Sequence, residues 1–365
     1  MQHYFKTSAT KFQLILDRQQ EWRARIDMVE KAQRFLYVST YYIEYDDYAI
    51  EFFACLRRAA KRGVRVYLII DGFGQVLSSN LMTKAGKKKL HALLNELVAN
   101  GGKTVFYRPP KLLQRLLGGG YHIKYQVSEA GDMLFSSSNI SQMSFKRWME
   151  FSVLLRGPVV ALMLEDLFRI LDAPCESDLV AVTEVGEGDA SDFLFEFITY
   201  IPANDPSPLS PILQREKNPI TEKLIDHIEA ARSKIVLTSF YFKPQPRLFA
   251  AIQRAAQRGV RVEIHHSHRD ALVGVTRVPW LAASARYPAM LQNGFAIYEH
   301  KLGQHTKFVL IDERLAWLGS YNFEHTADDR LAEAMLVTTD DRVVRQVQRF
   351  FAALRADPQS QLFTQ

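Results

Sequence analysis

Two stretches of the chain, 119–140 and 303–323, carry the same polar residue types at the same spacings. Each contains a histidine and a lysine two positions apart and an asparagine 17 positions after the histidine. A glutamate follows each stretch, 28 positions after its histidine. The matched residues are His122, Lys124, Asn139 and Glu150 in the first copy, and His305, Lys307, Asn322 and Glu333 in the second. Repetition at fixed spacing indicates a shared chemical role, because each residue type alone is common on protein surfaces.

Two histidines and two lysines suit displacement at a phosphodiester. This reaction needs a nucleophile, an acid for the leaving oxygen, and positive charge beside the phosphoryl oxygens. A neutral imidazole is a competent nucleophile near pH 7, and a second, protonated imidazole is a competent acid. The lysines would supply the positive charge and the asparagines would donate hydrogen bonds, so the pattern predicts catalysis without a metal or other cofactor.

The two glutamates fit the remaining role, because a carboxylate bonded to one ring nitrogen fixes the tautomer of a histidine and stabilises its imidazolium. The spacing leaves open whether each glutamate serves the histidine of its own half or of the other half. Simpler uses exist for single residues: a solvated lysine, an asparagine in a turn, or a glutamate in an exposed salt bridge. The repetition favours catalysis over these uses.

A second repeat indicates the elements that position the motifs. The sequences RAAKRGVRV at 58–66 and RAAQRGVRV at 254–262 differ at one position. Each ends a helical pattern that lies between two strand-like runs, and a glycine ends the helix. Each half is therefore predicted to run strand, helix, strand, variable loop, and then a strand that points its histidine and lysine to one face.

Alternating strands and helices predict an α/β fold with two similar lobes, each a mixed or parallel sheet flanked by helices. A pseudo-twofold axis between the lobes would bring both histidines to one phosphorus atom. The expected boundaries are an N-terminal lobe at 1–185, a linker or surface loop at 186–219, and a C-terminal lobe at 220–365. Five prolines within 202–219 are typical of a linker.

The composition limits the class of protein. The 365 residues are 47% hydrophobic and 24% charged, with a net charge of +6, which suits an anionic partner such as phospholipid headgroups or nucleic acid, or simply solubility. No uninterrupted apolar run of about 18 residues predicts a membrane span, and the first residues do not form a secretory signal. Cys55 and Cys175 are the only cysteines, which favours a reducing compartment, so we expect a cytoplasmic location.

The motifs resemble those of the phospholipase D superfamily, whose signature is H-x-K-x4-D followed by Gly-Ser-x-Asn and an acidic residue. The second copy matches it throughout, with Asp312, Gly319 and Ser320 beside the residues named above. The first copy departs in two places, with Glu129 for the aspartate and Ser136 for the glycine, while Ser137 matches Ser320. Within the superfamily, the sequences YRPPKLLQRLLGGGYHIK and LLRGPVVALML are most similar to bacterial cardiolipin synthases.

The resemblance implies a phosphohistidine intermediate on one histidine, while the other protonates the departing alcohol and deprotonates the incoming one. In many relatives the first-half histidine is the nucleophile, which gives that role to His122. Glu129 and Asp312 lie five residues beyond the motif lysines, on the opposite side of a strand, so we expect them to support the structure.

Three histidines lie close together in the sequence EIHHSH, residues 263–268, at the end of a predicted strand that should border the site. Only His266 and His268 would share a face. A substrate contact is the functional hypothesis for these two, an exposed strand end is the simpler one, and metal binding lacks a completing carboxylate or cysteine.

The segment before the first motif interleaves basic and leucine residues, which predicts either a short amphipathic membrane contact or a core-packing helix with a basic outer face. Its residues are Lys111, Leu112, Leu113, Arg115, Leu116 and Leu117. The basic stretch 83–91 would add attraction to an anionic surface.

The leading functional hypothesis is a phosphatidyltransferase of the cardiolipin synthase type that acts on phosphatidylglycerol. We expect the protein to associate peripherally with the membrane surface. A phospholipase D that hydrolyses phospholipids and a metal-independent nuclease are the alternatives, and a binding protein without activity is disfavoured because both motifs are intact. Leucines before the first motif favour lipid, and no aromatic-basic strand pattern for stacking bases is evident. A monomer suffices, since one chain carries both motifs. The sequence leaves open the donor and acceptor lipids, transfer or hydrolysis, and the membrane leaflet.

Overall fold

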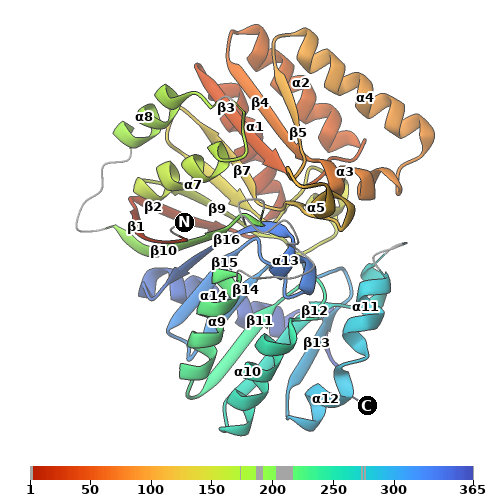
Figure 1. The fold of residues 1–365 in the computed structure, drawn as a ribbon, viewed down its shortest axis with the longest axis vertical. Helices are drawn as coiled ribbons and strands as arrows, with labels where there is room; N and C mark the ends of the chain where they lie inside the picture. The colour runs from red at the N-terminus through yellow and green to blue at the C-terminus, as the bar shows by residue number, and fades with distance from the viewer. Residues whose placement is uncertain are drawn as a thin grey trace.

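The fold was analysed in a computed structural model, which describes residues 3–172, 174–185, 192–202, 217–272, 274 and 277–364. Two sheets with helices packed on both of their faces lie next to each other (Figure 1). The molecule therefore has the predicted α/β architecture with two similar lobes.

The first sheet has seven strands in the order β2-β9-β8-β7-β3-β4-β5. Strands β3, β4 and β5 are parallel, and the remaining neighbours are antiparallel. In this order the strands are β2 (Lys11–Ile15), β9 (Ser152–Arg156), β8 (Met133–Ser136), β7 (Lys124–Ser128), β3 (Phe35–Thr40), β4 (Arg65–Asp71) and β5 (Lys103–Tyr107).

The second sheet repeats this order and extends it at both edges. The strands run β1-β10-β16-β15-β14-β11-β12-β13-β17, and β6 also pairs with β16. In this order they are β1 (Tyr4–Ala9), β10 (Phe193–Tyr200), β16 (Leu331–Thr338), β15 (Leu315–Gly319), β14 (Phe308–Ile311), β11 (Lys234–Thr238), β12 (Arg261–Ser267), β13 (Ala296–His300), β17 (Ser360–Leu362) and, off the path, β6 (Gly120–Tyr121). The matching run β9-β8-β7-β3-β4-β5 and β16-β15-β14-β11-β12-β13 shows the duplication.

Helices complete the two lobes. The helices of the first half are α1 (Arg18–Lys31), α2 (Asp47–Lys61), α3 (Gly72–Ser79), α4 (Lys84–Ala99), α5 (Leu112–Leu116), α6 (Gln142–Lys146), α7 (Pro158–Phe168) and α8 (Glu176–Val185). Those of the second half are α9 (Pro219–Ala230), α10 (Pro246–Gln257), α11 (Arg277–Ser284), α12 (Tyr287–Gln292), α13 (His325–Asp329) and α14 (Asp341–Ala356). Gly63 and Gly259 follow α2 and α10 with φ of 91° and 93°, a conformation that glycine adopts without steric cost.

One hydrophobic core is shared by the two lobes. It contains the buried faces of α7 and α14 together with inward side chains of both sheets. Phe151 beside β9 and Phe308 of β14 lie across this boundary with ring centroids 4.6 Å apart. The lobes are therefore packed as a single unit, and the site between them has a fixed geometry.

Two strands depart from the expected lobe boundaries. Strand β1 lies within 1–185 but pairs with β10 in the second sheet, and β10 lies within 186–219, where a linker was expected. The run FLFEFITY that forms β10 is rich in aromatic and β-branched residues, which favour strands. The rest of the expected linker before Lys217, residues 186–191 and 203–216, lies outside the described part of the chain.

Candidate active site

The H-x-K segments lie where each motif strand begins. Lys124 is the first residue of β7, and His305 and Lys307 come just before β14. Here side-chain hydroxyls replace backbone partners: Ser39 Oγ accepts from Tyr125 N at 2.8 Å, and Thr238 Oγ1 accepts from Phe308 N at 2.9 Å. The expected motif strands thus begin at or after the lysines.

Both histidines and both asparagines line one cavity of about 750 Å³ between the lobes. The twofold relation of the lobes brings together residues that are 183 positions apart in the sequence. The cavity walls also include apolar and aromatic side chains, among them Phe73, Leu77, Leu81, Met82 and Trp148. A cavity with a polar floor and apolar walls suits a ligand with a polar centre and apolar parts.

The carboxylates cross between the lobes. His305 Nδ1 lies 2.7 Å from Glu150 Oε2, and His122 Nδ1 lies 3.0 Å from Glu333 Oε1. Backbone contacts set up this exchange, because His305 N donates to Met149 O at 2.9 Å and His122 N donates to Ala332 O at 3.0 Å. Each histidine is thus paired with the glutamate of the other half, which the sequence left open.

Each motif lysine is buried and donates to the backbone of its own histidine. Lys124 Nζ lies 2.7 Å from His122 O, and Lys307 Nζ lies 2.5 Å from His305 O. Burial, with the neighbouring Lys307 charge, lowers the pKa of Lys124 to about 7, and burial lowers the pKa of Lys307 to about 8. A bound anion would favour the charged form of both lysines.

Both asparagines line the cavity together with the histidines. Asn139 Oδ1 accepts from Tyr42 N at 3.4 Å, whereas the buried Asn322 Oδ1 has no hydrogen-bond partner among the residues that the structure describes. Both side chains line the cavity, so their amides are available to a ligand there.

Aromatic rings enclose the histidines and were not predicted. Tyr41 meets the His122 ring edge-on at 4.8 Å, and Phe240 meets the His305 ring in the same way at 4.8 Å. Trp148 adds a second contact to His305, at 5.1 Å. The signal was present in the sequence, because Tyr41 and Phe240 occupy matching positions after the strands that precede the two repeated helices.

The two His–Glu pairs differ electrostatically. Burial opposes the charge of Glu150, but the His305 interaction and nearby donors lower its pKa to about 2. Burial raises the pKa of Glu333 to about 8, although Lys124 opposes the shift. Burial also lowers the pKa of His305 to about 4 and that of His122 well below its usual range.

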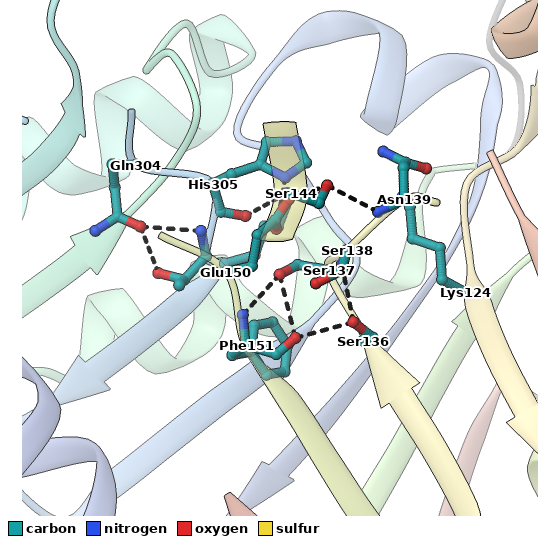
Figure 2. A network of polar contacts seen from close by, with 12 residues as sticks. Lys124, Ser136, Ser137, Ser138, Asn139, Ser144, Glu150, Phe151, Gln304 and His305 are labelled. Carbon is teal, nitrogen blue, oxygen red and sulfur yellow. Dashed lines mark hydrogen bonds and ion pairs between the residues drawn. The ribbon is translucent and has the colours of Figure 1, made fainter. Parts of the chain in front are cut away.

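The supporting residues separate into two groups. Ser137 Oγ accepts from Phe151 N, next to Glu150, at 3.0 Å (Figure 2). Ser320 Oγ donates to Glu333, so each serine holds a segment that carries a glutamate. Glu129 accepts from Gln33 N at 2.6 Å, and Asp312 accepts from Ser233 N at 2.7 Å. Glu129 and Asp312 are outside the cavity lining, each at the start of the strand next to its motif strand.

His266 and His268 do not line the cavity. His266 is buried, and its Nε2 lies 2.6 Å from Tyr287 Oη, which in turn donates to Glu299. His268 Nδ1 accepts from Asp270 N at 3.2 Å in a surface turn. These two histidines therefore lie outside the cavity lining, in contact with Tyr287 of α12 and with the backbone of Asp270. Within the described ranges, no group of three or more His, Cys, Asp or Glu side chains is placed to hold a metal ion.

The segment before the first motif forms α5 and leaves two of its leucines exposed. Leu112 and Leu116 are 68% and 71% exposed, whereas Gln114 is buried and donates to Pro202 O at 2.9 Å. The other segment residues are Lys111, whose backbone precedes the helix, Leu113, Arg115 and Leu117. Arg115 Nε donates to Pro109 O at 2.5 Å. No helix in the part of the chain that the structure describes is long and apolar enough to span a bilayer.

Two further carboxyls in the cavity wall were not predicted. Burial raises the pKa of Glu44 to about 7 and that of Glu324 to about 7. Both line the cavity with the histidines, and in their neutral form they can exchange hydrogen bonds with hydroxyl groups.

Comparison with known proteins places this geometry in a family. The sequence matches the family described as "Cardiolipin synthase, PLD-like domain" over residues 26–171 and 224–355, which together make up most of the chain. Cardiolipin synthase B of Escherichia coli K12 is 24% identical over 346 residues, covering 90% of this chain and 76% of the relative. Cardiolipin synthase of Geobacillus kaustophilus is 23% identical over 313 residues, covering 81% of this chain and 56% of the relative.

A solved structure shares the fold. The crystal structure of phosphatidylserine synthase from Haemophilus influenzae Rd KW20 aligns with a TM-score of 0.73 at 16% identity, covering 99% of this chain and 89% of that one. The matched regions of the family each contain one copy of the paired motif. The chain therefore belongs to the cardiolipin synthase, PLD-like domain family, and it is an enzyme of the phospholipase D superfamily.

Proposed function

We propose that the protein is a phosphatidyltransferase of the cardiolipin synthase type, which moves a phosphatidyl group from one phospholipid headgroup alcohol to another. The observation that carries this proposal is the pair of crossed His–Glu contacts facing one cavity with apolar walls. Relatives that bear the name cardiolipin synthase support it. Phosphatidylglycerol is the proposed substrate. We assign the two lobes and the site residues as the sequence predicted, except for strands β1 and β10 and for His266 and His268.

In the proposed first step, His122 Nε2 attacks the phosphorus of the donor lipid. A P–N bond forms while the P–O bond to the headgroup alcohol breaks, and the imidazolium of His305 gives its Nε2 proton to the leaving oxygen. Lys124 and Lys307, with the amides of Asn139 and Asn322, stabilise the charge on the phosphoryl oxygens.

In the second step, the incoming alcohol replaces the departed one. Neutral His305 takes the proton of the incoming hydroxyl, whose oxygen bonds to phosphorus while the P–N bond to His122 breaks. Both histidines return to their starting states, so one phosphodiester is exchanged for another without a net change in charge. Water in place of the alcohol would give hydrolysis.

His305 is the better proton donor of the two histidines. Its Nδ1 faces an ionised carboxylate at 2.7 Å, which stabilises an imidazolium once an anionic phosphodiester is bound. His122 faces a glutamate whose pKa burial raises to about 8, so a cation there has weaker support. This difference supports His122 as the nucleophile.

We also propose that the rim of the cavity rests on an anionic membrane surface. Leu77 and Leu81 line the cavity and are 38% and 45% exposed, and Pro279 of α11 lines it from the second lobe. The ring of Phe73 lies beside Gly118, immediately after α5, so the exposed leucines of α5 belong to the same rim. Exposed leucines with nearby lysines suit peripheral binding to anionic lipid, and the net charge of +6 has the matching sign.

The experiment that tests the function is lipid mass spectrometry after incubation of the protein with phosphatidylglycerol vesicles in excess EDTA. We expect cardiolipin from the wild type, and none from His122→Ala or His305→Ala. EDTA should have no effect, because lysines supply the charge that a metal would otherwise provide. Phosphatidic acid alone would instead indicate a phospholipase D, and unchanged lipid would contradict the proposal and direct the assay to nucleic-acid substrates.

A further inference from the structure

The two half-sites are not equivalent, and the difference lies in one residue behind each glutamate. Five positions after the motif asparagine, the first half has Ser144 and the second half has Ala327. Both residues are fully buried, on α6 and α13 respectively. The exchange of a serine for an alanine at matched, buried positions changes the hydrogen-bond donors available to the two glutamates.

Ser144 links the backbone of Asn139 to the carboxylate of Glu150, the glutamate that is paired with His305. Asn139 N donates to Ser144 Oγ at 3.1 Å, which leaves the serine proton for Glu150 Oε1 at 2.8 Å (Figure 2). The second carboxylate oxygen, Oε2, is then free to accept from His305 Nδ1 at 2.7 Å. The order of donors fixes the His305 tautomer, with the proton on Nδ1 and Nε2 toward the cavity.

The second half-site lacks this connection. Ala327 has no hydroxyl, and Glu333 accepts instead from Ser320 Oγ through Oε2. His122 Nδ1 and Glu333 Oε1 are 3.0 Å apart but are not aligned for a hydrogen bond, and neither atom has a hydrogen-bond partner elsewhere in the described part of the chain. A carboxylate held by two aligned hydrogen bonds stabilises a facing imidazolium better than a carboxylate that lacks such hydrogen bonds.

We propose that Ser144 is a positioning residue that turns the Glu150 carboxylate toward His305, and that its replacement by Ala327 in the other half makes His305 the proton donor and His122 the nucleophile. This inference rests on the proposed phosphatidyl transfer and adds which residue divides the roles. It predicts that the roles depend on the hydroxyl at these two positions.

The test compares Ser144→Ala, the exchange variant Ser144→Ala/Ala327→Ser, and the control Ser141→Ala with wild type on phosphatidylglycerol vesicles. Ser141 is a buried serine that begins the same helix and has no hydrogen bond to Glu150. The readouts are the pH profile of kcat, the KM, and the histidine that carries the phosphatidyl group after rapid quenching in base and peptide mass spectrometry.

The wild type should show a bell-shaped profile with the adduct on His122. The low-pH limb belongs to the histidine that must be neutral, and the high-pH limb to the one that must be protonated, both as properties of the coupled pair. In Ser144→Ala the Glu150 carboxylate is no longer oriented toward His305, so the imidazolium of His305 is less stabilised and its pKa falls. The high-pH limb should therefore move down by about one unit, with kcat reduced about tenfold and KM little changed.

The exchange variant separates a specific role from a structural one. We expect part of its adduct on His305, because the better-held carboxylate now faces His122, while Ser141→Ala keeps the wild-type limb and adduct. An unchanged limb in Ser144→Ala together with an adduct on His122 alone in the exchange variant would overturn the inference. Wild type without transfer would instead overturn the proposed function, so the two failures are distinguishable.

Discussion

At the scale of single residues, the site is defined by which atom faces which. Glu150 presents one oxygen to Ser144 and the other to His305, whereas Glu333 has a hydroxyl contact on one oxygen only. The two carboxyls also differ in pKa although both are buried: the His305 interaction lowers the pKa of Glu150 to about 2 against the effect of burial, whereas burial raises the pKa of Glu333 to about 8. Burial alone would raise both values, so the difference arises from the local donors and charges.

Exchange of each glutamate for glutamine should have unequal effects on transfer at pH 7. Glu150→Gln replaces an ionised group by a neutral one and should lower kcat by roughly 10⁴, the size of loss seen when the orienting carboxylate of a catalytic histidine is neutralised. Glu333→Gln resembles the protonated form that a pKa of about 8 favours at pH 7, so the loss should be roughly tenfold. Steady-state kinetics of the two variants on vesicles measure this difference.

Raising the pH provides the control for this pair. As Glu333 ionises above pH 8, the wild type and Glu333→Gln should diverge, whereas the Glu150→Gln deficit should be similar at pH 7 and 8. Equal losses for both variants at pH 7 would contradict the asymmetry.

The sequence alone could match these residues between the two halves, but it could not pair each glutamate with a histidine. The spacing repeat placed the histidines, lysines, asparagines and glutamates in two matched sets, and the cavity contains both histidines and both asparagines. The crossed pairing depends on backbone contacts between the lobes, such as His305 N to Met149 O, which no spacing within one half encodes. Tyr41 and Phe240 were missed because aromatic residues at strand ends are usually core residues.

At the scale of elements, the start of each strand next to the motif strand is held by an acidic side chain. Asp312 follows β14 with φ of 51° and accepts from the backbone N–H groups of Arg232, Ser233 and Lys234 ahead of and at the start of β11. Glu129 does the same for Gln33 and Phe35 at β3. The signature acidic position therefore fixes the backbone just past the end of the motif strand, whereas the cavity lies at the beginning of that strand.

Asp312→Ala should lower the free energy of unfolding by about 1–3 kcal/mol, because three backbone donors lose their acceptor. Urea unfolding followed by circular dichroism measures the change. Activity per folded molecule should stay within about twofold of wild type, since the residue does not line the cavity. A large loss of kcat without loss of stability would instead assign Asp312 to the chemistry.

Sequence patterns predicted the repeated elements better than the unrepeated ones. The helices α2 and α10 with their flanking strands were identified because each appears twice with nearly the same residues. Strand β1 has no counterpart in the first sheet, and it pairs with β10, which holds the place that β2 holds in the other half. The β1–β10 pairing joins residues about 190 positions apart, a distance over which local patterns carry no information.

At the scale of the whole molecule, the two lobes form one body with the cavity mouth at their junction. Helices α3, α5 and α11 lie on the same side of the view in Figure 1, away from β10. Helix α5 and the segment around α3 carry exposed leucines. This arrangement allows one face of the protein to meet a membrane while the lipid headgroup enters the cavity.

The double variant Leu112→Ser/Leu116→Ser should reduce binding to phosphatidylglycerol vesicles by roughly tenfold, because each partly buried leucine contributes about 1 kcal/mol or more to membrane contact. Vesicle sedimentation measures the binding. The matched control is Leu194→Ser, since Leu194 is 67% exposed, close to the 68% of Leu112, but belongs to β10, a strand that lies away from α5 in Figure 1. Equal losses in the two variants would place the membrane surface elsewhere.

The crossed carboxylates have a consequence for how such a chain could arise. A protein with one lobe has a histidine without its carboxylate, so it would have to pair with a second copy of itself before either site was complete. In such a pair every substitution appears twice, and both half-sites stay identical. Fusion of the two copies in one gene removes that constraint, and one lobe can then lose a hydroxyl, as at Ala327, while the other keeps it at Ser144. The two histidines can therefore take different catalytic roles only after the two copies are joined in one chain.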